Sequence, residues 1–215
     1  MIKVNEPRPG TPDETQRRAM AAARLLFVRK GYFNTSISDI VAESGVSIGS
    51  LYHHFGSKQG LALRLYEETL DSIVALMEER VGQKEGLPAK LRMAVALLLE
   101  SADRDPLQLE YMLFVKHDEI QPNFVPICMS KPFLLIQGLL RSGVEQGLVK
   151  DLPVPMLAAA FMGIPIRLFE LKLRGMIDYP LADRTADVFA MCWDAVRTGA
   201  HDSDSSLANP GGRHQ

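Results

Sequence analysis

The stretch GVSIGSLYHHF, from Gly45 to Phe55, admits two incompatible interpretations. Its first five residues satisfy the pattern G-x-S-x-G, the nucleophile elbow that would make Ser47 the attacking group of a hydrolase. Taken as a whole, the stretch is typical of the tight turn and second helix of a DNA-binding unit. The segments on either side of it decide between the two.

The residues before Gly45 predict a helix, which argues against the hydrolase. In NTSISDIVAESG, Ser36 stands at an N-cap position with Asp39 three residues further on, and apolar residues recur at helical spacing. A nucleophile elbow needs a strand before its serine, and the chain has no alternating strand pattern. No acid and histidine follow Ser47 in an arrangement typical of a catalytic triad. We therefore expect Ser47 to cap a helix, and we expect no catalytic residue and no enzymatic activity.

Helix signals continue on both sides of this pair of short segments. TPDETQRRAMAAARLLFVRKG predicts a first helix, with Thr11 as its N-cap and Gly31 as its left-handed stop. Ser47 is expected to begin a third helix, and Ser57 a fourth of about 25 residues. Further helical segments, opened by proline and closed by glycine, fill the rest of the chain. The predicted fold is all-α, with about nine helices.

Composition and charge are those of a soluble globular protein with an uneven distribution of bases. The chain has 215 residues, of which 47% are hydrophobic and 23% charged. Its net charge is −2, but residues 1–58 carry eight basic and five acidic side chains, whereas the remainder carries 16 and 21. A basic first quarter is typical of a head that binds a polyanion.

The cysteines and histidines predict neither a disulfide framework nor a metal site. Cys128 and Cys192 stand far apart, with no metal-ligand spacing. His53 and His54 are neighbours, and neighbours on a helix point about 100° apart, so the pair cannot easily grip one ion. We interpret KHDE, residues 116–119, as the polar end of a helix. No metal and no other cofactor is expected.

Nothing in the sequence predicts export or membrane insertion. The N-terminal MIKVNEPRPGTPDE lacks the apolar core of a signal peptide. No uncharged apolar run reaches the roughly 18 residues that span a bilayer. The nearest is VPMLAAAFMGIPI, residues 154–166, for which we predict a buried helix. A cytoplasmic protein without a membrane partner is expected.

Two short helices joined by a tight turn and braced by a longer helix form a helix-turn-helix. Val46, Leu51 and Phe55 would pack the second short helix against the first short helix and against Phe27 and Phe33. The outward side would carry Ser47, Ile48, Gly49, Ser50, His53 and His54. Because Gly49 and Ser50 are small, this side could approach a DNA groove closely.

At this point the sequence resembles a known family. TSISDIVAESGVSIGSLYHHFGSKQGLALRLYEE, from Thr35 to Glu68, is similar to the DNA-binding head of TetR-family transcriptional regulators. The similarity covers about residues 13–68 and rests on the capped short helix, A-x-x-x-G-V-S, L-Y-x-x-F, and S-K at the start of a long helix. It implies a homodimer whose third helices enter the major groove of a near-palindromic operator, and a body that binds a small effector.

The resemblance also implies DNA contacts at eight positions: Ser36, Ser47, Ile48, Gly49, Ser50, Tyr52, His53 and Lys58. Ser36 would bind phosphate near the start of the second helix, and Lys58 would do so at the start of the fourth. The positions on the third helix would lie at the groove, with Tyr52 and His53 on the backbone or the base edges.

Two positions depart from the usual family pattern. Ile48 stands where a basic or small residue is common, which leaves the third helix without lysine or arginine and without bidentate guanine recognition. Ile48 would contact a thymine methyl group or pack partly against the head. Gly60 stands where an acidic residue often completes the capping box after Ser57, so we expect a loosened first turn in the fourth helix.

For the body, the resemblance implies a ligand cavity and a dimer surface. Flexible thioethers and aromatic rings suit an adaptable apolar cavity, and the candidate lining residues are Met112, Val115, Phe133, Gln137, Phe161 and Met162. The last two helices would form a four-helix bundle with a partner through Gly163, Arg167, Leu171, Phe189, Trp193 and Val196. Arg167 would pair with an effector carboxylate, with the partner subunit, or with Glu170 on its own helix.

These expectations divide the chain into three parts. Residues 1–58 form an N-terminal arm and helix-turn-helix domain, residues 59–199 a helical effector-binding and dimerisation domain, and residues 200–215 a disordered polar tail. The implied function is that of a ligand-responsive transcriptional repressor, released from its operator by a small effector. The alternatives are a helical adaptor that binds protein through its Met-rich body and no DNA, and a hydrolase that uses Ser47.

Overall fold

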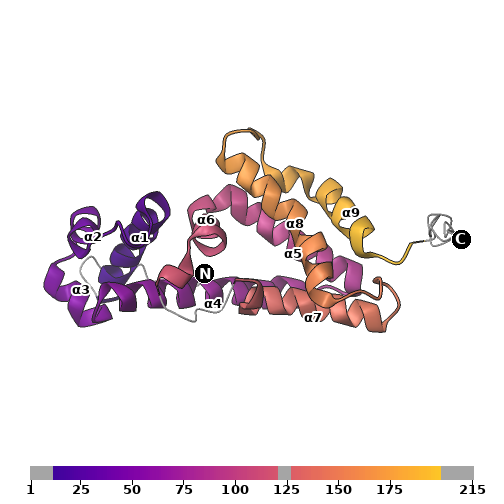
Figure 1. The fold of residues 1–215 in the computed structure, drawn as a ribbon, viewed down its shortest axis with the longest axis horizontal. Coiled ribbons are helices and arrows are strands. Elements are labelled where there is room, and N and C mark those ends of the chain that lie inside the picture. Colours follow the sequence, from indigo (N-terminus) through magenta and orange to yellow (C-terminus); the bar gives the residue numbers. More distant parts are fainter. Residues whose placement is uncertain (1–11, 121–126, 200–215) are drawn as a thin grey trace, which may run out of the picture.

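The computed structural model describes residues 12–120 and 127–199, and over these ranges the chain is helical (Figure 1). Apart from one isolated bridge between Val149 and Arg197, no β-structure occurs in the described ranges. These ranges contain nine α-helices, which confirms the expected fold class: α1 Pro12–Lys30, α2 Ile37–Ser44, α3 Ile48–Phe55, α4 Lys58–Gly82, α5 Leu87–Arg104, α6 Pro106–Phe114, α7 Lys131–Glu145, α8 Val154–Leu173 and α9 Thr185–Val196. Three short 3₁₀ helices join them: η1 His117–Glu119, η2 Ile127–Met129 and η3 Leu181–Arg184. The expected Thr11 cap and the tail at 200–215 lie outside the described residues.

The helix boundaries in the head follow from the capping residues. Ser36 and Asp39 form the reciprocal capping box that begins α2, and Gly45 ends α2 at φ 65°. The Ser47 hydroxyl accepts the Ser50 N–H at 3.2 Å and begins α3. Ser57 caps α4, which runs for 25 residues as expected. Because helix α2 precedes Ser47, the strand-to-helix geometry of a nucleophile elbow is not formed.

The core of the head contains one aromatic residue that differs from the expected set. Phe27, Val46 and Leu51 are buried as expected, and Phe55 packs against them half-buried. Phe33 is 69% exposed, so its expected place in the core is wrong. Tyr32 takes this place instead, with its ring centroid 5.5 Å from that of Phe27. The Thr35 N–H donates to the Tyr32 carbonyl at 3.3 Å, so Phe33 and Asn34 are the two central residues of a β-turn, and both are exposed.

Helix α4 joins the head to the body. It packs against α1 and α3 at the head and against α5, α6 and α7 along the body (Figure 1). In the body α5 is central: Leu91, Val95 and Leu99 are fully buried, and the helix contacts α4, α7, α8 and α9. Since α4 runs through both parts without a break, the expected division at residue 58 falls at its first residue and stays a prediction.

Helix α8 is more exposed than expected for an apolar helix. It has 20 residues and by length and composition could cross a membrane, yet only 33% of its most apolar stretch is buried. One side, with Phe161 and Phe169, is in the core, while Met156 is 60% exposed. The expectation of a buried helix therefore holds for one side of α8 only, and its other apolar side is open in the single chain.

Candidate functional site

The exposed face of α3 is slim and mostly without charge. Leu51 is 2% exposed and fastens α3 to the head, while Ile48 and Tyr52 are 52% and 50% exposed on the outer side. A Cβ atom placed on Gly49 would meet nothing within 4 Å. This face therefore has room for a close approach of the helix backbone to another molecule. Of the eight predicted DNA contacts, six are exposed, whereas Ser50 and Lys58 are half-buried.

The Ser36 hydroxyl is already engaged within the head. It donates to Asp39 Oδ2 at 2.8 Å and accepts the Asp39 N–H at 3.0 Å. The hydrogen bond from the Ser36 backbone N–H, together with its hydroxyl and the nearby Lys30 ammonium, lowers the pKa of Asp39. Asp39 thus stays ionised at neutral pH beside the predicted phosphate contact, and Lys30, with Nζ 3.5 Å from Asp39 Oδ1, offsets its charge. The phosphate role of Ser36 stays a prediction.

The Lys58 side chain links two segments of the head through hydrogen bonds. Its ammonium donates to the carbonyl oxygens of Tyr32 at 2.9 Å and Thr35 at 3.0 Å, and lies 4.1 Å from the centroid of the Tyr32 ring. Burial lowers the pKa of this ammonium. The side chain therefore ties the start of α4 to the turn between α1 and α2, a structural role that sequence pattern did not predict. Its third N–H remains for a phosphate contact.

Replacing Lys58 by methionine is expected to lower the free energy of unfolding by about 2 kcal/mol, because two inward-facing carbonyl groups lose a charged donor. Urea denaturation measures this change. Lys84→Met, at a half-buried lysine in the segment that follows α4, is the matched control. The salt dependence of DNA binding then separates the two roles, since loss of one phosphate contact reduces the logarithmic slope by about one. An unchanged free energy of unfolding in Lys58→Met would contradict the structural role of Lys58.

The two histidines of α3 point in different directions. The Gln16 amide and His54 Nδ1 lie 3.2 Å apart, so His54 turns toward α1, while His53 stays exposed. The expectation that both face outward is therefore wrong for His54. The two rings meet edge-on at 5.2 Å. Among the described residues no group of three His, Cys, Asp or Glu side chains could hold a metal ion.

Gly60 holds the close contact between α3 and α4. A Cβ atom at this position would lie 2.1 Å from the carbonyl oxygen of Phe55. The Gly60 N–H donates to the Ser57 hydroxyl at 2.9 Å, so the first turn of α4 is capped. The Ser57 half of the capping box is therefore formed, while the expected loosening of this turn stays a prediction. Glycine stands here because only a residue without a side chain lets the Phe55 carbonyl come so near.

An apolar cavity of about 60 Å³ lies in the body between α4, α5, α6, α7 and α8. Three of the predicted lining residues contribute to it: Met112, Phe133 and Met162. The others in the lining are Ile73, Leu76, Met77, Leu97, Leu98, Ser101, Leu109, Pro132 and Ile136. Ser101 has the one hydroxyl group among these side chains. Met77 was not among the predicted residues, although the same thioether argument applies to it.

The other three predicted lining residues lie elsewhere. Phe161 is fully buried in the core outside the cavity wall. Val115 lines a separate cleft where the head meets the body. Gln137 donates to the Cys128 carbonyl at 2.9 Å, because one residue beyond Ile136 the side chain is rotated about 100° away from the cavity. These three residues do not line this cavity, and their role in ligand binding stays a prediction.

The predicted dimer residues divide into a surface and a core group. Gly163 and Arg167 are exposed on α8, and Leu171, Phe189 and Trp193 are half-buried. Val196 is fully buried within the single chain, so it cannot face a partner. Arg167 pairs with Glu170 on its own helix, one of the three alternatives expected for it.

A capped pair of short helices, with one exposed glycine-bearing face, on a separate helical body defines a helix-turn-helix DNA-binding protein. Residues 19–65 match the model described as "Bacterial regulatory proteins, tetR family". This match and the relatives below show that the chain carries the DNA-binding head of a TetR-family transcriptional regulator.

Relatives and solved structures are similar over most of the chain. The uncharacterized HTH-type transcriptional regulator YfiR of Bacillus subtilis is 26% identical over 71% of this chain and 77% of its own. The fatty acid metabolism regulator protein of the same organism is 23% identical over 73% and 76%. The structure of the B. subtilis transcriptional regulator FadR in complex with stearoyl-CoA superposes with a TM-score of 0.64 at 18% identity, over 83% of this chain and 98% of that one.

Proposed function

We propose that this chain is a homodimeric, cytoplasmic repressor that leaves its operator when an effector with a long acyl chain enters the body cavity. It is not proposed to catalyse any reaction. The observation that carries the proposal is the position of α6, which lines the cavity and also packs against α1 of the head. The solved complex of FadR with stearoyl-CoA supports the effector class.

The lining of the cavity favours an apolar, flexible ligand. All its side chains except Ser101 are apolar, so a polar effector would lose hydration without gaining hydrogen bonds. Its volume of about 60 Å³ is well below the roughly 300 Å³ of ordinary ligand sites. A ligand must therefore displace side chains, and the unbranched thioethers of Met77, Met112 and Met162 are suited to moving aside.

Helix α6 provides the link between cavity and head. Leu109 and Met112 line the cavity from one side of α6. At its start, Asp105 Oδ1 accepts the Gln108 N–H at 3.0 Å, while Asp105 Oδ2 lies 3.8 Å from Arg24 of α1. A ligand that pushes α6 outward would move α1 with it. The two heads would then no longer match half-sites about one DNA turn apart.

Filling the cavity from the side away from α6 tests this proposal. Met162→Trp on α8 is expected to raise the stearoyl-CoA concentration needed to release operator DNA by about tenfold or more, because the indole takes the space of the acyl chain. Fluorescence anisotropy of a labelled operator, obtained by selection from random DNA, measures release. Met129→Trp, at a 53% exposed methionine, is the matched control. Release of the Met162→Trp protein at the wild-type concentration would refute the site.

The open side of α8 is proposed as the dimer surface. Met156, Ala160, Gly163 and Arg167 recur at helical spacing and are all exposed. Next to it, the rings of Phe189 and Trp193 on α9 stack 6.3 Å apart. Small residues allow two helices to approach closely, and a second copy would cover the apolar side that α8 leaves open. The family's paired heads support this assignment.

Gly163→Arg is expected to convert the dimer to a monomer, because it places a long charged side chain where two apolar helices would meet. Sedimentation velocity measures the oligomeric state. Gly138→Arg, at an exposed glycine of α7 whose added Cβ would also meet nothing within 4 Å, is the control. A wild-type chain that sediments as a monomer at micromolar concentration would rule the dimer out.

A further inference from the structure

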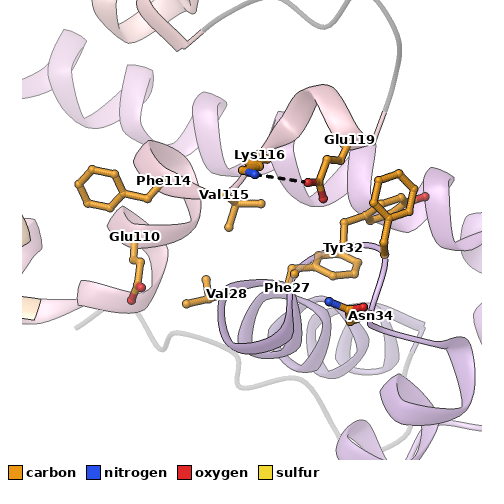
Figure 2. Close-up of a pocket in the computed structure, with 11 residues that line it drawn as sticks. Phe27, Val28, Tyr32, Asn34, Glu110, Phe114, Val115, Lys116 and Glu119 are labelled. Atoms are coloured by element: carbon orange, nitrogen blue, oxygen red, sulfur yellow. Dashed lines mark ion pairs between the residues drawn. The ribbon is translucent and has the colours of Figure 1, made fainter.

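A second hollow lies where the head meets the body, separate from the apolar cavity. It has a volume of about 320 Å³ and shares no lining residue with the body cavity. The end of α1 and the turn after it form the head side, and the end of α6 with the segment through η1 forms the body side (Figure 2). We call it the junction cleft; its lining residues are Phe27, Val28, Gly31, Tyr32, Phe33, Asn34, Glu110, Phe114, Val115, Lys116 and Glu119.

The head side of the junction cleft exposes one aromatic ring to solvent, that of Phe33. Phe33 is 69% exposed and meets Tyr32 edge-on at 5.6 Å. Phe27 lies behind them in the core. On the body side Phe114 is 41% exposed and stacks on Phe169 of α8. Large aromatic surfaces that remain open to water at a concave site favour a ligand that covers them.

The body side of the junction cleft carries an excess of negative charge. Glu110 and Glu119 line it, and Lys116 is its one basic lining residue. Lys116 is 78% exposed, with Nζ 3.9 Å from Glu119. Within the described ranges, no hydrogen bond or ion pair involves the Glu110 carboxylate. Burial raises the pKa of Glu110 because its carboxylate is partly removed from water. A positive charge beside the carboxylate would stabilise its ionised form.

We propose that the junction cleft binds a small organic cation with an aromatic body. In Figure 2 Glu110 lies on the Val28 side of the cleft and Glu119 on the Tyr32 side. The ammonium group pairs with Glu110, and the aromatic body covers the exposed ring of Phe33, whose face also attracts a cation. An anionic acyl thioester is disfavoured by the same carboxylates. A ligand here touches head and body together and provides a second input to DNA binding.

Calorimetric titration of the full chain with 4-phenylbutyltrimethylammonium tests this site, with neutral 4-phenylbutanol as the matched probe. The cation is expected to bind at least about tenfold more tightly than the alcohol. Glu110→Gln keeps the shape and removes the charge, and is expected to weaken cation binding about tenfold without changing alcohol binding. Phe33→Ala is expected to weaken both probes several-fold. Glu85→Gln, at an exposed carboxylate between α4 and α5, is the control and should bind as wild type.

Three results would overturn the assignment. Equal affinities for the cation and the alcohol would show that the charge of the ligand does not contribute to binding. Cation binding by Glu110→Gln at wild-type strength, or the absence of cation binding by wild type, would remove the site. Loss of cation binding in Met162→Trp would place the probe in the body cavity instead. Since acyl release is measured with a different ligand and variant, failure here leaves the proposed repressor function untouched.

Discussion

Replacing Gly49 by glutamate is expected to abolish operator binding while the protein stays folded. A Cβ atom at Gly49 meets nothing within 4 Å, so a side chain there extends from α3 into the space that DNA would occupy. A carboxylate at this point faces the phosphates, and like-charge contacts cost several kcal/mol. We expect a loss of affinity of about 100-fold or more, measured by fluorescence anisotropy at constant salt. Circular dichroism should show unchanged helix content.

The alanine variant separates the needs of DNA binding from those of folding. Gly49 lies inside α3, where alanine is favoured over glycine by roughly 0.5–1 kcal/mol. Gly49→Ala should therefore raise the unfolding free energy and still weaken DNA binding. Gly138→Glu, at an equally open glycine of α7, is the control and should bind DNA as wild type does. Wild-type DNA affinity in Gly49→Glu would disprove the placement of α3 in the groove.

The second large effect is expected at Gly60, where alanine should destabilise the head by about 3 kcal/mol or more. The added Cβ would lie 2.1 Å from the Phe55 carbonyl oxygen, and this neighbour is backbone and cannot rotate away. Either α4 loses its first turn or α3 shifts against α4. Both outcomes lower the midpoint of urea denaturation, and the second also misplaces α3 for DNA. This result would show that glycine here serves a contact between helices.

Gly49→Ala is the matched control for Gly60→Ala, because both exchanges add one methyl group to a helical glycine of the head, and only the one at Gly60 meets a neighbour. The two variants are expected to change stability in opposite directions. Gly60→Ala with a denaturation midpoint equal to that of wild type would mean that the α3–α4 contact relaxes easily. In that case Gly60 would be tolerated at this position rather than required.

Local chemistry made the helices of the head predictable. Ser36, Ser47 and Ser57 each place a hydroxyl oxygen where free N–H groups begin a helix, and Gly45 supplies the positive φ that ends α2. These interactions involve residues two to four positions apart, so sequence alone contains them. The same caps distinguished the helix-turn-helix from a nucleophile elbow at Ser47.

Contacts between distant segments could not be predicted in this way. The ammonium of Lys58 meets carbonyl groups more than twenty positions earlier, at Tyr32 and Thr35. Of two adjacent aromatic residues, Tyr32 is buried and Phe33 exposed, a choice that depends on how the turn packs against Phe27 and Lys58. A pattern shows that an aromatic residue packs in this region, but not which of two neighbours does so.

The sequence by itself determined the three capped helices α2, α3 and α4 and with them the helix-turn-helix head, because hydrogen bonds within one turn specify where these helices start. Which apolar side chains surround the body cavity was decided only by tertiary packing. Helix α8 is apolar on several sides, so its pattern could not tell that Met162 would line the cavity, Phe161 the core and Gly163 the surface. When apolar residues occur on all sides of a helix, their spacing does not indicate which side faces the core. The rotation of such a helix about its axis is then set by the helices that pack against it.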